Sequence, residues 1–218
     1  MTDRRAELFD QVLDFRTNYI TVVLENIFQP HNASAVLRSC DCFGIQTVHI
    51  IENDNEYNIN PDVTLGSDKW LSMTTHNKHE KNTITAIRSL KDQGYRVVAT
   101  TPHHRKVNLN HFDVFAGKFA LLFGTELNGL SEEAIEESDE FLTIPMYGFT
   151  ESFNISVSAA IILHHLTEKM RSSELDWQLT SEEKMSLKLE WLRKTIRKSD
   201  LIEKEFYSAQ NKSRNIKR

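Results

Sequence analysis

The sequence predicts an α/β protein with a parallel sheet flanked by helices, and two observations carry this prediction. Five short runs are rich in β-branched and aromatic residues and lack strict alternation, as strands buried on both faces do: residues 19–25, 47–52, 95–100, 118–124 and 140–144. The segments between these runs carry helix signatures, with polar capping residues at their starts and glycine after several of them. Such alternation of strands and helices is typical of a parallel sheet covered on both faces.

Three helices of this pattern have recognisable starts. Asn32 is expected to cap a helix that ends at Gly44. Asn82 is expected to cap a second helix, which ends at Gly94 and carries isoleucine and leucine on one stripe. Ser131, which is followed by two glutamates, is expected to begin a short acidic helix.

The two ends of the chain differ in character from the middle. Residues 1–18 have the charged, amphipathic pattern of a helix. After Arg171, Thr180 and Glu183 have the spacing of a capping box, and the charged helix that follows is expected to carry Leu189, Leu192 and Ile196 along one side. The sequence therefore predicts one domain over residues 19–172, with helical extensions over 1–18 and 173–218.

Charge is distributed unevenly along the chain. The formal net charge of the 218 residues is −5, but the segment 184–218 holds 11 Lys/Arg against 4 Asp/Glu, a local +7 that leaves −12 for the rest. Such asymmetry favours a basic tail that meets a polyanion, although a solvated helix with a basic end explains it equally well. No apolar run approaches the length of a membrane span and no secretory signal is evident, so a cytoplasmic protein is expected.

Several common catalytic motifs are absent from the sequence. There is no G-x-G, so neither the dinucleotide-binding fingerprint nor a glycine-rich phosphate loop is present, and there is no G-x-S-x-G nucleophile elbow. His76 and His79 lack a partner cluster, so no metal site is expected. Cys40 and Cys42 are too close in sequence to form a disulfide with each other.

Three polar segments stand out in apolar surroundings. The first holds Asn32 and Arg38, six residues apart at a helix start. The second holds Glu126 just beyond the end of a buried strand, where open α/β sheets bind ligands. The third is a long polar connection that ends in Ser152 and Asn154, whereas a connection between strand and helix usually takes roughly two to six residues. From the residues alone, a helix cap with a surface arginine and an ordinary turn remain possible for the first two.

Taken together, these segments resemble the motifs of a known family. "NASAVLRSCDCFG", "FGTELNGLS" and "IPMYGFTESFNISVSAAI" are similar, in this order, to the three motifs of the SpoU/TrmH branch of the SPOUT RNA 2′-O-methyltransferases. Phe153 and Ile155 replace the usual leucine and valine of the third motif, and "GSDKW" at 66–70 resembles an element of tRNA-modifying members. The resemblance spans roughly residues 20 to 170.

The resemblance implies a fold, a cofactor and a site. Members of this family carry a deep carboxyl-terminal trefoil knot, hold S-adenosylmethionine in the knotted loops and work as homodimers. By the resemblance, Arg38 acts on the 2′-hydroxyl as a base or as an electrostatic stabiliser, and four residues hold Arg38 and the ribose in place: Asn32, Glu126, Ser152 and Asn154. The cofactor pocket is expected to be lined by Thr100, Gly124, Ile144, Met146 and Phe153.

The terminal extensions favour a particular substrate. The layout resembles members of the family that methylate guanosine 18 in the D-loop of tRNA, and about twenty residues before the first strand leave no room for a separate RNA-binding domain. The basic segment is expected to contact tRNA through Arg193, Lys194, Arg197 and Lys198. Methylation of another tRNA nucleotide or of ribosomal RNA, a non-catalytic RNA-binding protein, and a small-molecule methyltransferase remain as alternatives.

Overall fold

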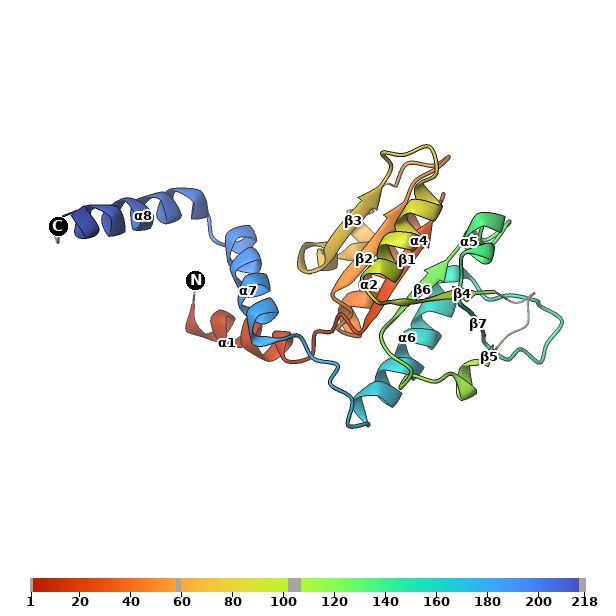
Figure 1. Cartoon of the computed structure of the whole chain (residues 1–218). Coiled ribbons are helices and arrows are strands. Elements are labelled where there is room, and N and C mark those ends of the chain that lie inside the picture. The colour runs from red at the N-terminus through yellow and green to blue at the C-terminus, as the bar shows by residue number, and fades with distance from the viewer. Residues whose placement is uncertain (1, 58–59, 102–106, 216–218) are drawn as a thin grey trace. The chain divides into compact units, whose positions relative to one another are not determined.

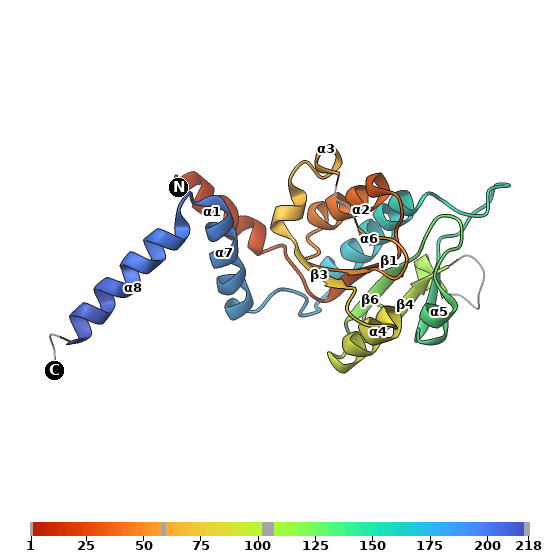
Figure 2. The ribbon, with the colours of Figure 1, turned by 90° about the horizontal axis from the view of Figure 1, so that it is seen from above.

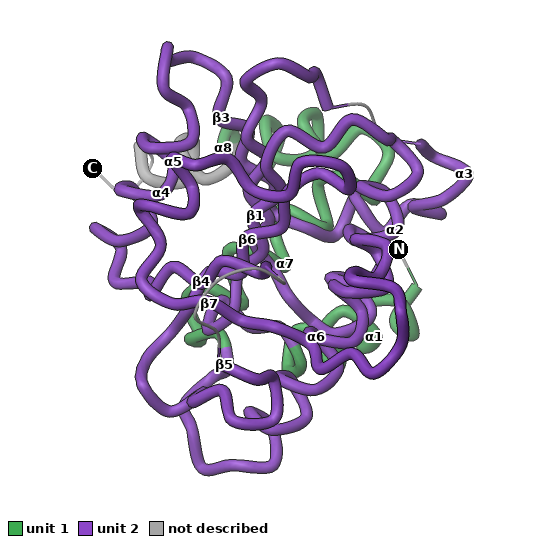
Figure 3. Tube along the Cα trace, turned by 90° about the vertical axis from the view of Figure 1, so that its right-hand side faces the viewer, with its two compact units in different colours: residues 1–15, 179–218 green, residues 16–178 purple. Residues whose placement is uncertain are grey.

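The structure is a computed structural model that describes residues 2–57, 60–101 and 107–215, with the backbone alone for 209–215. The chain divides into two compact units (Figure 3). Residues 16–178 form the larger unit, and residues 1–15 and 179–218 together form the smaller one.

The larger unit is built on one parallel sheet. Seven strands lie in the order β3-β2-β1-β6-β4-β7-β5 (Figure 1). The five predicted strands are confirmed as β1 Ile20–Glu25, β2 Thr47–Ile51, β4 Arg96–Thr100, β6 Phe119–Phe123 and β7 Glu140–Thr143. The sequence prediction missed β3 Ser72–His76 and β5 Val107–Asn108. β3 pairs with β2 alone and is half-exposed, so it lacks the apolar run of the inner strands, and β5 has only two residues.

Helices cover both faces of the sheet. Figure 2 shows α2 Pro30–Cys42 and α6 Ile155–Arg171 on one face, and α4 Asn82–Asp92 and α5 Glu132–Glu136 on the other. Val36, Leu37 and Leu163 bury the first pair against the central strands, and Ile87 and Leu90 bury α4 against the opposite face. The short helices α3 Pro61–Thr64, η1 Ser67–Trp70 and η2 Leu109–His111 lie in connections.

The structure confirms one predicted helix start of this unit and corrects two others. Ser131 caps α5, as predicted, and Asn154 caps α6. Asn32 is not a cap, because α2 begins two residues earlier, at Pro30, whose fixed φ suits the first helical position. Asn82 is also inside its helix, where its side chain instead ties the loop before α4 by accepting from the His79 N–H and donating to the Glu52 carbonyl.

The smaller unit contains three helices, α1 Asp3–Leu13, α7 Ser181–Thr195 and α8 Ser199–Asn215. The predicted capping box of Thr180 and Glu183 is present at the start of α7. The predicted apolar side is only partly buried: Leu192 and Ile196 are half-buried and Leu189 is 42% exposed, whereas the fully buried residues of α7 are Leu187 and Trp191. The ring of Trp191 packs edge-on against Phe9 of α1, with centroids 5.5 Å apart, so the side of α7 that faces α1 is set by this aromatic pair.

Among the residues that the structure describes, no helix has both the length and the apolar character of a membrane span. Nor do these residues contain a group of three or more His, Cys, Asp or Glu side chains that could hold a metal ion, and His103 and His104 lie outside the described residues.

His49 and His76 form an unexpected pair between β2 and β3. Nδ1 of His49 lies 3.0 Å from Nε2 of His76. Burial, with a smaller contribution from His76, lowers the pKa of His49 from 6.5 to about 4. Because the unfolded chain then binds more protons between these two values, the free energy of unfolding should fall as pH is lowered through this window. Urea unfolding at pH 7 and pH 5 should show the loss, and His49→Gln should show less of it. An equal loss in the variant would contradict this assignment.

Candidate active site

The candidate site lies where the course of the chain reverses in the sheet. β1 and β6 are neighbours, yet the chain runs from β1 to β2 and β3 on one side, whereas β4, β7 and β5 lie beyond β6. Such a switch point leaves a crevice at the carboxyl ends of the strands, which is where open parallel sheets bind ligands. Residues of the second and third motifs line this crevice.

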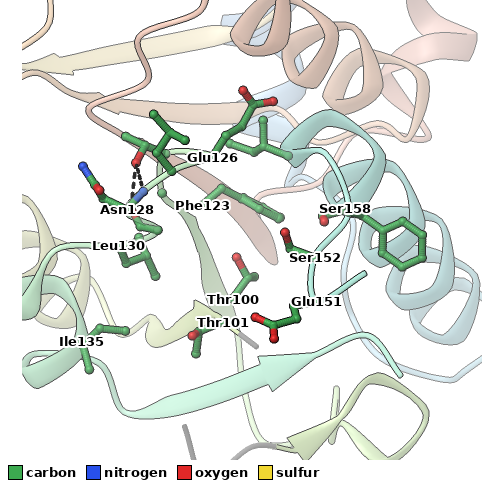
Figure 4. Close-up of a pocket in the computed structure, with 16 residues that line it drawn as sticks. Thr100, Thr101, Phe123, Glu126, Asn128, Leu130, Ile135, Glu151, Ser152 and Ser158 are labelled. Carbon is green, nitrogen blue, oxygen red and sulfur yellow. Dashed lines mark hydrogen bonds between the residues drawn. The ribbon is translucent and has the colours of Figure 1, made fainter. Parts of the chain in front are cut away.

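Two adjoining cavities hold the predicted cofactor residues. The larger, of about 390 Å³, is lined by Thr100, Gly124 and Phe153 among others, and Figure 4 shows the side chains of Thr100, Glu151 and Ser152 gathered at it. The smaller, of about 70 Å³, is lined by Ile144, Met146, Thr100 and Phe153. Because both cavities share Thr100, Ser152 and Phe153, all five predicted residues line one continuous region.

A tight turn after β6 forms one wall of the larger cavity. The N–H of Thr125 donates to the Gly129 carbonyl (2.8 Å), and the N–H of Gly129 donates back to the Thr125 carbonyl (3.0 Å). A Cβ on Gly124 would lie 2.1 Å from the Gly129 carbonyl oxygen, which no side chain tolerates. Gly124 is therefore required by the close approach of two backbone segments, and this wall of the cavity consists largely of main chain.

The three motifs meet at the carboxylate of Glu126. Its Oε1 accepts from Nδ2 of Asn32 (2.6 Å) and from Nδ2 of Asn154 (2.5 Å). Nδ2 of Asn154 also donates to Oδ1 of Asn32 at 3.3 Å. Asn32 is 4% exposed, and its buried amide therefore depends on these partners. In Figure 4 the Glu126 carboxylate points away from Thr100 and Ser152.

Arg38 and Ser152 lie outside this cluster. Arg38 is exposed on α2, and its side chain forms no hydrogen bond or ion pair with the residues that the structure describes. Because Asn32 is inside the helix, six positions turn Arg38 by about 240° from it, so the two cannot share a face. Ser152 is exposed at both cavities. A single chain thus brings together Asn32, Glu126 and Asn154 but not Arg38.

The sequence comparisons agree with this geometry. Residues 19–164 match the SpoU rRNA methylase family. The chain belongs to this family. A tRNA (guanosine(18)-2′-O)-methyltransferase of Borreliella burgdorferi is 43% identical over 203 residues, which are 93% of this chain and 91% of that protein. A protein of the same name from Thermus thermophilus is 34% identical, over 88% of this chain and 98% of its own length.

Solved structures show the same fold. The crystal structure of a TrmH/SpoU tRNA-modifying enzyme from A. aeolicus matches with a TM-score of 0.76 and 29% identity, over 89% of this chain and 98% of that one. An AdoMet-bound rRNA methyltransferase from Sinorhizobium meliloti matches with a TM-score of 0.61 and 23% identity, over 75% of this chain and 60% of that one. The α/β sheet described above is therefore the fold of known SpoU proteins.

Sequence reasoning missed several residues of this SpoU-family site. Thr101, Glu151 and Ser158 line the larger cavity, and Gln29 accepts from Nδ2 of Asn32 at 2.9 Å. Glu151 is the one with a recognisable signal, because it stands inside the third motif directly before Ser152. Gln29 lies outside the quoted motifs, and only the hydrogen bond to Asn32 connects it to the site.

Asn154 has two separable tasks, and substitution should distinguish them. Its Oδ1 accepts from the Ser156 N–H at the start of α6, while its Nδ2 holds Glu126. Asn154→Ala removes both contacts and should lower the free energy of unfolding by about 1 kcal/mol. Asn154→Ser keeps a good cap but cannot hold Glu126, so it should retain most of the stability while losing methyl transfer. Full activity of the serine variant would show that the contact with Glu126 is dispensable.

Proposed function

We propose that this SpoU-family protein transfers the methyl group of S-adenosylmethionine to the ribose 2′-hydroxyl of guanosine 18 in tRNA. The observation that carries the proposal is the contact of Glu126 with Asn32 and Asn154 beside the cavity, because it joins all three motifs at one place. The relatives that are 43% and 34% identical bear the name of this activity. We also propose a cytoplasmic location, because the relatives named above modify tRNA.

The residues around the two cavities suit S-adenosylmethionine. Ile144 and Phe153 offer apolar surface for an adenine ring, and the main chain of the turn after Gly124 offers hydrogen-bonding groups for polar edges. The carboxylate of Glu151 lines the same cavity and could meet a cationic group. When bound, the cofactor supplies a sulfonium methyl group that is open to attack by an oxygen nucleophile.

The chain's own residues must orient the ribose and stabilise the charge that develops on its 2′-oxygen as the hydroxyl proton leaves to solvent. Glu126 holds the Asn32 and Asn154 amides through one carboxylate oxygen, which fixes a polar surface beside the cavity. We assign Arg38 an electrostatic role toward a phosphate or the developing oxyanion, because a guanidinium group holds its proton too firmly to serve as a base. Its planar, permanently charged head suits such contacts.

A homodimer with a trefoil knot forms the second part of the proposal. Three observations support it. The connection from β7 to α6 spans residues 144–154 and is longer than the sheet geometry requires. Tyr147 and Phe149 in this connection are almost fully exposed. Arg38 faces solvent in a single chain, away from the Glu126 cluster. A second copy of the chain would bring another active site within its reach. Sedimentation equilibrium would detect the dimer, and a purely monomeric active enzyme would exclude it.

Position-resolved methylation tests the reaction itself. A tRNA transcript with guanosine at position 18 is incubated with S-adenosylmethionine, and the methylated nucleotide is located by mass spectrometry of nuclease fragments. A transcript with 2′-deoxyguanosine at this position is the control, because it lacks only the acceptor oxygen. We expect one methyl group on guanosine 18 and none on the control. Methylation at another nucleotide would overturn the assigned position, and methylation of ribosomal RNA alone would overturn the substrate.

The basic side chains of the smaller unit should supply tRNA affinity rather than chemistry. Arg193 is paired with Glu203, and Lys194 with Glu190. Ion pairs at such exposed positions contribute little to stability, so a phosphate can replace either glutamate. We expect weaker tRNA binding and a flatter salt dependence when glutamine replaces Arg193, Lys194, Arg197 and Lys198. With fewer phosphate contacts, binding releases fewer counterions from the tRNA. Cofactor affinity should not change. Arg88→Gln with Lys91→Gln in α4 is the control. An unchanged salt slope in the fourfold variant would contradict the RNA role.

A further inference from the structure

A third cavity lies beside the Glu126 cluster, and the function proposed above does not use it. Its volume is about 170 Å³, and Asn32 and Glu126 form part of its wall. Ile27 and Ile155 in the wall are both buried, whereas Phe28 and Leu127 are 73% and 96% exposed. The cavity therefore combines apolar surface with polar side chains next to the proposed catalytic residues.

The hydrogen bonds of the cluster determine which way the Gln29 amide points. The N–H of Ser156 can only donate, so Asn154 must turn Oδ1 toward it and Nδ2 toward Glu126. Asn32 then accepts from Asn154 through Oδ1 and donates through Nδ2 to Glu126 and to Oε1 of Gln29. Gln29 is left with Nε2 as a donor that forms no hydrogen bond with the described residues.

Asn55 is oriented by the same reasoning. Its Nδ2 donates to the main-chain carbonyl of Asn26 at 3.2 Å, and a carbonyl can only accept. Oδ1 of Asn55 is therefore left as an acceptor without a hydrogen bond to the described part of the chain. Gln29 and Asn55 both line the cavity, and they carry one oriented donor and one oriented acceptor.

We propose that this cavity holds the base of the target nucleotide, with Phe28 against its face and with Gln29 and Asn55 on its Watson–Crick edge. An unstacked base is commonly held by an aromatic side chain while polar groups read its edge. Guanine offers O6 as an acceptor for Gln29 Nε2, and N1–H as a donor for Asn55 Oδ1. With the base beside Glu126, the attached ribose would lie next to the cofactor cavity.

The choice of guanine rests on the proposed function, because a donor and an acceptor also fit the edges of other bases. The structure contributes the cavity, the exposed ring of Phe28 and the two oriented amides of Gln29 and Asn55. The exposed surface of Phe28 and Leu127 could instead be covered by a second copy of the chain, and the experiment must separate these occupants.

The test compares tRNA transcripts that carry guanosine, inosine or 2-aminopurine riboside at position 18. Inosine keeps O6 and N1–H, whereas 2-aminopurine lacks both. For the wild-type protein we expect kcat/KM to be similar for guanosine and inosine and about tenfold or more lower for 2-aminopurine, the loss expected for one or two unmade hydrogen bonds. In Gln29→Glu, which keeps an acceptor for Asn32 but removes the free donor, the preference for guanosine over 2-aminopurine should shrink to the part that Asn55 contributes through N1–H. Gln29→Ala should behave in the same way.

Phe28→Ala should lower kcat/KM about tenfold for all three transcripts, because stacking does not depend on the edge of the base. Gln93→Ala and Phe115→Ala, at exposed positions of the same unit outside the site, are the matched controls and should leave all values unchanged. Affinity for S-adenosylhomocysteine, measured by calorimetry, should be unchanged in every variant.

Three outcomes would overturn the inference. If the Gln29 variants keep the wild-type preference among the three transcripts, Gln29 does not read the base. If Phe28→Ala changes the sedimentation behaviour while kcat/KM for all three transcripts stays at the wild-type value, a second copy covers this surface. If the wild-type protein does not methylate the guanosine transcript at all, both the proposed function and this inference are wrong. The first two outcomes contradict this inference alone and leave the proposed function intact.

Discussion

Replacing Arg38 with alanine is expected to lower kcat for tRNA methylation by about a hundredfold or more, the range seen when an electrostatic contact to a developing oxyanion is lost. The fold should be unaffected, because the Arg38 side chain is exposed on α2 and forms no hydrogen bond or ion pair with the described residues. Cofactor affinity should also persist, since Arg38 lines neither of the two cavities at the strand ends. Single-turnover methylation with saturating tRNA measures the effect.

Arg38→Lys tests the reason for this effect. A lysine keeps the charge but replaces the planar fork of donors with a single point, so it should rescue little of the activity. Arg88→Ala is the control, because Arg88 is an exposed arginine on α4, on the other side of the sheet. Turnover of the lysine variant within about tenfold of wild type would show that charge alone is needed and would argue against a contact that depends on geometry.

The inner part of the fold was predictable from local sequence because burial sets the composition of the strands. β1 and β6 are buried over their whole length, and their continuous apolar runs follow directly from this. β3 was not predicted because its middle residues are exposed, so the strand lacks a continuous apolar run. The start of α2 was misplaced because Asn32 has the chemistry of a cap, while Pro30 marks the actual first turn.

The arrangement of the site could not be derived from local sequence. Asn32 and Glu126 are 94 residues apart and Asn32 and Asn154 are 122 apart, so no periodicity connects them. Only the resemblance to a family placed these motifs together. The exposure of Arg38 and the oriented amide of Gln29 come from the structure, because both depend on how α2 begins and on which partners its side chains meet.

Gly124→Ala should be the most disruptive single-methyl change at the site. The added Cβ would meet the Gly129 carbonyl oxygen at 2.1 Å, and this atom belongs to main chain that is fixed by the hydrogen bonds between Thr125 and Gly129. The turn must therefore open, which should lower the free energy of unfolding by about 1–3 kcal/mol. Because the same turn forms a wall of the larger cavity, affinity for S-adenosylhomocysteine should fall by about tenfold or more, which is the effect of roughly 1.4 kcal/mol of lost contacts.

Gly148→Ala is the matched control for this prediction. Gly148 lies in the connection between β7 and α6, where an added Cβ meets nothing within 4 Å, so the same substitution creates no clash there. Its free energy of unfolding should stay within about 1 kcal/mol of wild type, with a small gain if alanine restricts the unfolded chain. Urea unfolding and calorimetric titration of both variants give the comparison. Equal stability and equal ligand affinity for Gly124→Ala and Gly148→Ala would mean that the turn after β6 yields without cost, and that it does not shape the cofactor cavity.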